Sequence, residues 1–147
     1  MSKHQLENEF YDGIVRGANA DGWPLMRTES SPGMIIPFDI MGCSPDGLAV
    51  GMECKMDPTV SLANPVKWRD FHIRQHGWLQ RYARHGAIAL VGICTPGRTV
   101  TVVRYQTLLD FDRPIYHLRH VVLTYHSRKG KEPEMWVGWN QLLINSR

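Results

Sequence analysis

Three residues near positions 39–55 have the side chains and spacing that phosphodiester chemistry requires. Glu53 and Lys55 are two residues apart in a strand-like segment, so both side chains project from one face. The turn sequence Ser44-Pro45-Asp46-Gly47 predicts a β-hairpin in which Asp39 lies opposite Glu53. Opposed like charges destabilise a sheet. A divalent cation between the carboxylates would offset that repulsion, with Lys55 facing a phosphate. The simpler interpretation of the same spacing is that Glu53 and Lys55 form a surface pair on an exposed face of the sheet.

Two polar residues occupy helical positions where the hydrophobic pattern predicts apolar ones. Apolar residues recur at helical spacing from Leu6 to Ala18, and Glu7 falls inside that stripe. In a second predicted helix, Gln75 lies in the middle of an aromatic stripe. A buried carboxylate needs a cation or hydrogen bonds, and a buried amide needs partners at both ends. The simpler interpretations are that Glu7 reaches solvent at the stripe's edge and that Gln75 is a core residue bonded to backbone.

The order of the predicted elements favours an α/β fold in which helices are layered on a sheet. Asn64-Pro65 predicts the start of the long second helix. The segment around Trp136 and Trp139 fits neither a helical nor a strand pattern. The predicted elements are a helix over 3–18, a strand over 24–28, a hairpin of 34–43 and 48–56, a helix over 64–85, a hairpin of 87–94 and 99–105, a short helix over 106–111 and a strand over 120–126.

Composition and charge narrow the class of protein. The chain has 147 residues and shows no repeat or long linker, so we expect one domain over 1–147. The net charge of +3 combines −5 over residues 1–60 with +8 over residues 61–147, which suggests a polyanionic partner beside a cation-concentrating site. Three cysteines without a CxxC pair argue against a disulfide framework. No segment has the pattern of a signal peptide or a membrane span, so we expect a soluble, cytoplasmic protein.

This arrangement resembles the PD-(D/E)XK nuclease superfamily, in which an acid, a hairpin and an acid-x-Lys triplet form a metal site. The matching positions are Asp39 and the triplet Glu53-Cys54-Lys55. Glu7 matches a glutamate that the family's first helix usually supplies, and Gln75 matches a frequent glutamine on the following helix. The resemblance implies a restriction-endonuclease-like core, which is a mixed β-sheet flanked by helices.

Within that superfamily the chain is similar to RecU-type and archaeal Holliday-junction resolvases over about residues 5–95. The segment Arg27-Thr28-Glu29-Ser30-Ser31 is similar to the pattern preceding the archaeal aspartate. The stretch from Asn64 to Gln75 resembles the RecU region that ends in a Phe-His-x-x-Gln helix. The sequence between Ser31 and Glu53 is too short for the RecU stalk, which leaves the mode of junction recognition open.

A second alignment makes Asp46 the metal ligand. Ser44-Pro45-Asp46-Gly47-Leu48 followed by Glu-x-Lys resembles the lambda-exonuclease-like branch of the superfamily. Pairing Asp46 with Glu53 would place the hairpin turn at Ala49-Val50, which is poor turn sequence. Hairpin geometry therefore favours Asp39 as the ligand and Asp46 as a turn residue.

The resemblance implies specific roles for these residues. Asp39, Glu53 and the Cys54 carbonyl would hold Mg²⁺, for which Mn²⁺ would substitute. Lys55 would orient a water molecule or offset transition-state charge, with Gln75 steadying it and Glu7 completing the metal shell. Candidate DNA contacts are Arg27, Ser31, Lys67, Arg69, His72 and Arg74; for His72 a structural role is an equal alternative.

The function that this resemblance implies is Mg²⁺-dependent, structure-specific cleavage of branched DNA by a homodimeric endonuclease, most closely a Holliday-junction resolvase. Two alternatives remain at this stage. One is a lambda-exonuclease-like recombination nuclease or another nuclease acting on double-stranded DNA. The other is a nucleic-acid-binding module without catalysis, in which the basic half binds the DNA backbone and the carboxylates are structural. None of these functions involves a membrane.

Overall fold

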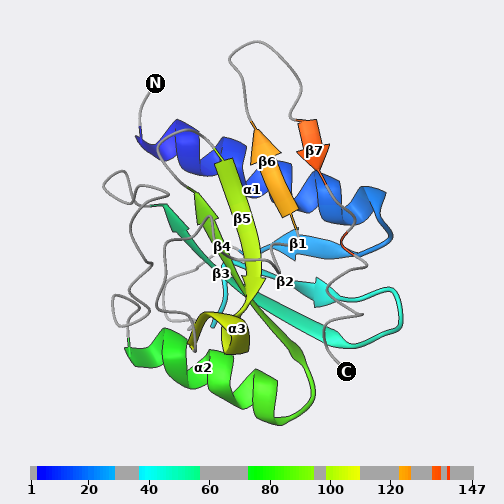
Figure 1. Ribbon diagram of the computed structural model, residues 1–147, viewed down its shortest axis with the longest axis vertical. Helices are drawn as coiled ribbons and strands as arrows, with labels where there is room; N and C mark the ends of the chain where they lie inside the picture. The colour runs from blue at the N-terminus through cyan, green and yellow to red at the C-terminus, as the bar shows by residue number, and fades with distance from the viewer. Residues whose placement is uncertain are drawn as a thin grey trace.

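The computed structural model describes residues 3–28, 37–56, 73–94, 99–109, 123–126, 134–136 and 139. In that part of the chain, helices accompany a sheet whose strands follow in the order β1-β2-β3-β4-β5-β6-β7 (Figure 1). The elements are α1 (Lys3–Ala20), β1 (Leu25–Arg27), β2 (Ile40–Cys43), β3 (Ala49–Met56), α2 (Ile73–Arg84), β4 (Ile88–Cys94), β5 (Thr99–Arg104), α3 (Tyr105–Leu109), β6 (Leu123–His126) and β7 (Glu134–Trp136).

The sheet is mixed. β3 and β4 pair in parallel, and α2 lies in the connection between them, while the other neighbouring strands pair antiparallel. This arrangement follows from connection length, because antiparallel strands can be joined by a tight turn whereas parallel strands need a longer crossover. The β2–β3 turn is the predicted one, and Gly47 adopts a φ of 85° there. Ile40 pairs with Met52 and Cys43 with Ala49, so the hairpin has the register that its turn sequence predicted.

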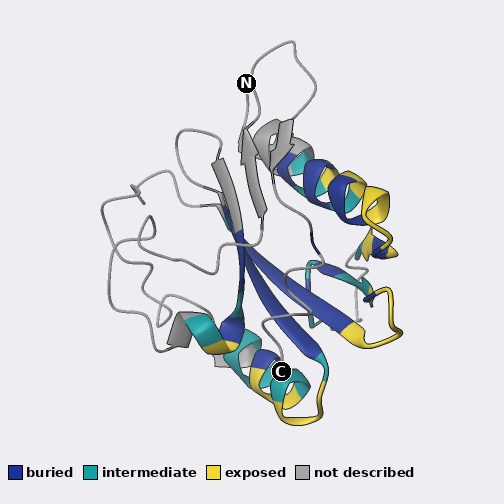
Figure 2. Cartoon of the chain, turned by 45° about the vertical axis from the view of Figure 1, so that its right-hand side comes forward, coloured by how far each residue is buried: buried dark blue, intermediate teal, exposed yellow. Residues whose placement is uncertain are grey.

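The two faces of the sheet are covered by different helices. Phe10, Ile14 and Ala18 of α1 pack on one face, as their helical spacing predicted, against strand residues that include Ile40 and Met52. Leu79 of α2 and Tyr105 of α3 pack on the other face. Figure 2 shows the buried central strands between helices whose outer sides are exposed. Among the described helices, none is both long and apolar enough to cross a membrane.

The described elements match most of the predicted ranges but differ near Phe38. The predicted strand over 34–43 is described only from Ile40, with residues 34–36 outside the described part. In a regular strand Phe38 and Ile40 would share one face. Phe38 instead packs on the α2 face while Ile40 packs on the α1 face. Gly51 makes this possible, since a Cβ at Gly51 would lie 2.5 Å from the Phe38 ring.

The C-terminal segment, which fitted neither pattern, contributes a strand and a buried aromatic residue. β7 pairs with β6 at the end of the sheet. Trp139 is fully buried with its ring centroid 5.6 Å from that of Trp23. Its backbone amide donates to Asp21 Oδ2 at 2.9 Å. Residues 64–72 of the predicted second helix lie outside the described residues, and α2 is described from Ile73.

Candidate active site

Asp39 is held where the hairpin register continues beyond β2. Its backbone amide donates to the Met52 carbonyl at 3.1 Å, and its carbonyl accepts from the Thr28 amide at 2.9 Å. One carboxylate oxygen of Asp39 accepts from the Cys54 amide at 2.9 Å. Contacts from both neighbouring segments therefore fix the position of this carboxylate, and it lies beside Glu53 as the turn sequence predicted.

Glu53 joins β3 to α2 through Gln75. The Glu53 side chain is only 3% exposed and lies on the α2 side of the sheet. Gln75 Nε2 donates to Glu53 Oε2 at 2.7 Å. Lys55 Nζ donates to Gln75 Oε1 at 3.0 Å. The amide in the aromatic stripe of α2 thus bonds to two side chains of β3 at once, rather than only to backbone.

Burial and a neighbouring carboxylate change the protonation of Glu53. Burial of the carboxyl group raises the pKa of Glu53 to about 9, the adjacent Asp39 charge and hydrogen bond contribute to the rise, and Lys55 opposes it. Without a cation, Glu53 therefore keeps its proton at neutral pH and shares a hydrogen bond with Asp39. Two carboxyl groups in this proximity repel each other when both are charged, and a divalent cation would offset that repulsion.

The donor set fits Mg²⁺ better than a metal held only by protein. In the described part of the chain, no three His, Cys, Asp or Glu side chains gather as a metal site. Mg²⁺ is commonly held by one or two carboxylates, with water and substrate phosphate completing its shell. Asp39 and Glu53 supply those two carboxylates. The Cys54 side chain packs in the α1-side core, so a role for this residue falls to its backbone carbonyl and stays a prediction.

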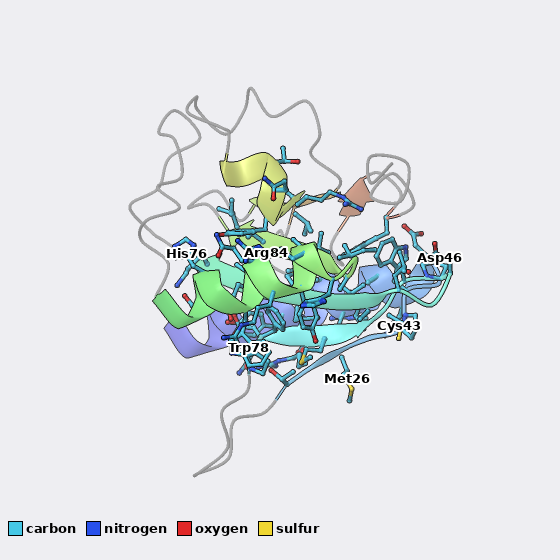
Figure 3. All side chains as sticks on the ribbon, turned by 90° about the horizontal axis from the view of Figure 1, so that it is seen from below. Met26, Cys43, Asp46, His76, Trp78 and Arg84 are labelled. Carbon is cyan, nitrogen blue, oxygen red and sulfur yellow. The ribbon has the colours of Figure 1, made fainter. Side chains whose placement is uncertain are left out.

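Asp46 lies far along the hairpin from these residues. It is exposed in the turn, where the Ser44 hydroxyl donates to its carboxylate and the Leu48 amide donates to Ser44 Oγ at 3.0 Å. Glu53 lies four residues beyond Ala49 along an extended strand, a length of about 13 Å. Figure 3 shows Asp46 at the opposite side of the molecule from His76 in the first turn of α2. This geometry favours Asp39 over Asp46 as the partner of Glu53.

Arg27, a predicted DNA contact, is engaged by α1. Its guanidinium contacts Asp12 Oδ1 at 3.3 Å and donates to Asn8 Oδ1 at 3.0 Å. The guanidinium carbon lies 4.9 Å from the centre of the Tyr11 ring. These contacts join β1 to α1. A phosphate contact by Arg27 stays a prediction.

Within the described part of the chain, the other predicted site residues are not placed beside Glu53. Glu7 lies in α1, which covers the other face of the sheet, and its side chain is outside the described residues. Ser31, Lys67, Arg69 and His72 are also outside them. Arg74 lies in the first turn of α2, and its side chain is outside the described residues. The proposed roles of these residues therefore stay predictions.

One pair beside the site was not found from the sequence. His76 follows Gln75 directly, and its Nδ1 lies 3.0 Å from the Tyr105 hydroxyl. The only sequence signal was the adjacency of His76 to Gln75. Nothing in the local pattern connects His76 to a tyrosine 29 positions later.

No protein-family model and no curated protein sequence matches the chain. A solved structure with a similar fold is Archaeoglobus fulgidus Hjc, a Holliday junction resolvase from an archaeal hyperthermophile. The match has a TM-score of 0.51 and 18% sequence identity, and it covers 72% of this chain and 83% of that chain. This likeness confirms the predicted fold class, a restriction-endonuclease-like mixed sheet flanked by helices.

Proposed function

We propose that the protein is a Mg²⁺-dependent DNA endonuclease of the PD-(D/E)XK superfamily. The observation that carries the proposal is the convergence of four predicted residues, which are Asp39, Glu53, Lys55 and Gln75, at one place on the sheet. A buried, solely structural Glu53 would disfavour folding above its ordinary pKa, whereas a cation-binding Glu53 has a function that explains its burial. The shared fold with a resolvase supports the same chemistry by analogy.

Asp39 and Glu53, with the Cys54 carbonyl, would hold the ion. A bound Mg²⁺ would supply a more acidic water and would neutralise charge on the phosphate. The chain's own contribution is to fix the two carboxylates before the ion arrives. Backbone hydrogen bonds fix Asp39, and Gln75 fixes Glu53.

Lys55 supplies a positive charge whose position is set by Gln75. Because Gln75 Oε1 accepts from Nζ, the ammonium group is held on the same face as Glu53. At that position it would orient the attacking water or offset the negative charge that develops on the phosphate oxygens. Glu7 would complete the metal shell only by reaching this site from α1, whose helix covers the other face of the sheet. Contacts to the DNA backbone, which do not read sequence, would come from Lys67, Arg69, His72, Arg74, Arg27 and Ser31.

We further propose that the substrate is branched DNA, cut as a Holliday junction by a homodimer. The excess of basic residues after position 60 supports a polyanionic ligand. One structural neighbour is a Holliday junction resolvase, which favours branched over linear DNA. Two copies of the site would be needed to cut two opposed strands.

The test is cleavage by the purified protein with Mg²⁺ of a four-way junction, a fork and a linear duplex. We expect paired, symmetric nicks near the branch point of the junction. Lys55→Ala should lower the cleavage rate by about 100-fold or more while DNA binding is retained. Arg16→Ala removes a basic residue on α1, and it controls for the loss of one positive charge.

Each other outcome contradicts part of the proposal. Degradation of linear duplex from its ends would replace the resolvase with a lambda-exonuclease-like enzyme. DNA binding without cleavage of any substrate, unaffected by Mg²⁺ or by Lys55→Ala, would identify a binding module. Junction cleavage by a protein that stays monomeric during turnover would contradict the homodimer alone.

A further inference from the structure

The first turn of α2 is attached to the rest of the molecule on two sides. Gln75 bonds to Glu53 and Lys55 of β3. The next residue, His76, bonds to Tyr105, the first residue of α3, at 3.0 Å. Consecutive helical residues point about 100° apart, so one turn can hold two different elements. Figure 3 shows His76 at one end of α2.

Tyr105 is a rigid partner for His76. It is 1% exposed and packs in the α2-side core with Val91, Ile93 and Val103. It follows β5 directly, so its backbone is fixed by the end of a central strand. Burial raises the pKa of the Tyr105 phenol, which keeps the hydroxyl protonated and available for this hydrogen bond.

The geometry of Gln75 leaves little tolerance for movement of this turn. Hydrogen bonds of 2.7 and 3.0 Å connect its amide to Glu53 and Lys55. A shift of about 1 Å would place both outside the range of effective hydrogen bonds. Leu79, buried one turn further along, fixes the body of α2 against the sheet.

We propose that His76 and Tyr105 are positioning residues of the site: their hydrogen bond holds the first turn of α2 where Gln75 reaches Glu53 and Lys55. The proposal rests on the proposed nuclease function only for its catalytic consequence. Loss of the bond lets the turn move away from β3, and Lys55 Nζ loses its acceptor in Gln75. Catalysis then falls while DNA binding is unaffected.

The decisive variant is Tyr105→Phe, which keeps the buried ring and removes the hydroxyl. Tyr82→Phe is the matched control, because Tyr82 lies on α2 and packs through its ring, 4.6 Å from Phe38. We expect Tyr105→Phe to lower kcat by about 10-fold, the effect of one lost hydrogen bond, with KM for junction DNA unchanged within about 2-fold. Tyr82→Phe should change neither.

A double variant distinguishes positioning from general destabilisation. If Tyr105 acts through Gln75, then Tyr105→Phe should cause no further loss of kcat in a Gln75→Ala background. Independent effects would multiply. A readout that needs no activity is the side-chain amide resonance of Gln75 in ¹H–¹⁵N spectra, which Gln75→Ala assigns. Tyr105→Phe should move that resonance toward the position of a solvent-exposed glutamine, and Tyr82→Phe should leave it in place.

The positioning role is overturned if the Gln75 amide resonance is the same in Tyr105→Phe as in the unmodified protein. It is also overturned if the kcat losses of Tyr105→Phe and Gln75→Ala multiply in the double variant. Absence of cleavage by the unmodified protein would overturn the proposed function instead. The amide resonance would still decide whether Tyr105 positions Gln75.

Discussion

Replacing Glu53 with glutamine should stabilise the protein while abolishing its proposed activity. The glutamine side chain would keep the size of the original, and its amide can still hydrogen-bond to Asp39. What Glu53→Gln removes is a carboxyl group that must either hold its proton or carry a charge in a buried site. At any pH at which Glu53 is ionised in the unfolded chain, the need to protonate it on folding lowers the free energy of unfolding of the unmodified protein.

The magnitude follows from linkage. The pKa of Glu53 is raised from its ordinary value of 4.5 to about 9. The stabilising contribution of the protonated form is therefore fully present below pH 4.5 and is lost as the pH rises to about 9. Within that window each pH unit lowers the free energy of unfolding by about 1.4 kcal/mol. Between about pH 5.5 and about pH 7.5 the loss is about 3 kcal/mol, and it does not depend on the folded pKa as long as that value stays above the upper pH.

The assay is urea unfolding followed by tryptophan fluorescence in EDTA at those two pH values. The advantage of Glu53→Gln over the unmodified protein should increase by about 3 kcal/mol from the lower to the higher pH. Asp46→Asn removes an exposed carboxylate and serves as the control for the loss of one acidic group. A difference for Glu53→Gln that is the same at both pH values would falsify the buried, protonated Glu53.

Three further predictions concern the ligand, the core and the metal. Asp39→Ala should lower the cleavage rate by about 100-fold or more, whereas Asp46→Ala should leave it within about 3-fold; equal losses in a gel assay would contradict the assignment of Asp39. Gly51→Ala should lower the free energy of unfolding by about 2 kcal/mol in urea titrations, because the new Cβ would lie 2.5 Å from the Phe38 ring; unchanged stability would contradict that packing. EDTA should abolish cleavage and Mn²⁺ should restore it, and cleavage that persists in EDTA would exclude a divalent ion.

Local chemistry was sufficient to predict the hairpin and its register. The turn at Ser44–Gly47 has strong turn residues, and the register of a hairpin is set by its turn. Once the turn is fixed, counting outward places Asp39 opposite Glu53, and the structure pairs their neighbours Ile40 and Met52. Gln75 was found in a similar way, because a helical wheel places an amide in an aromatic stripe.

Other features depended on packing between distant segments. Phe38 does not follow the alternation of faces expected of a strand, because its ring fills the space above Gly51. The hydrophobic periodicity of the sequence gives no sign of that space. Arg27 looked available for phosphate, but its contacts with Asn8 and Asp12 depend on how β1 lies against α1. The bond between His76 and Tyr105 joins residues whose types are common and whose separation has no periodic signature.

The identity of residue 75 follows from the two partners that it serves. The side chain must donate to Glu53 and accept from Lys55. A lysine at this position could donate but not accept, and an ionised glutamate could accept but not donate. An apolar residue would suit the helix stripe but would leave a buried carboxyl group with one fewer partner. An amide can donate to one partner and accept from the other. A glutamine among the aromatic residues of a helix therefore indicates that the strand beneath it carries both an acidic and a basic group.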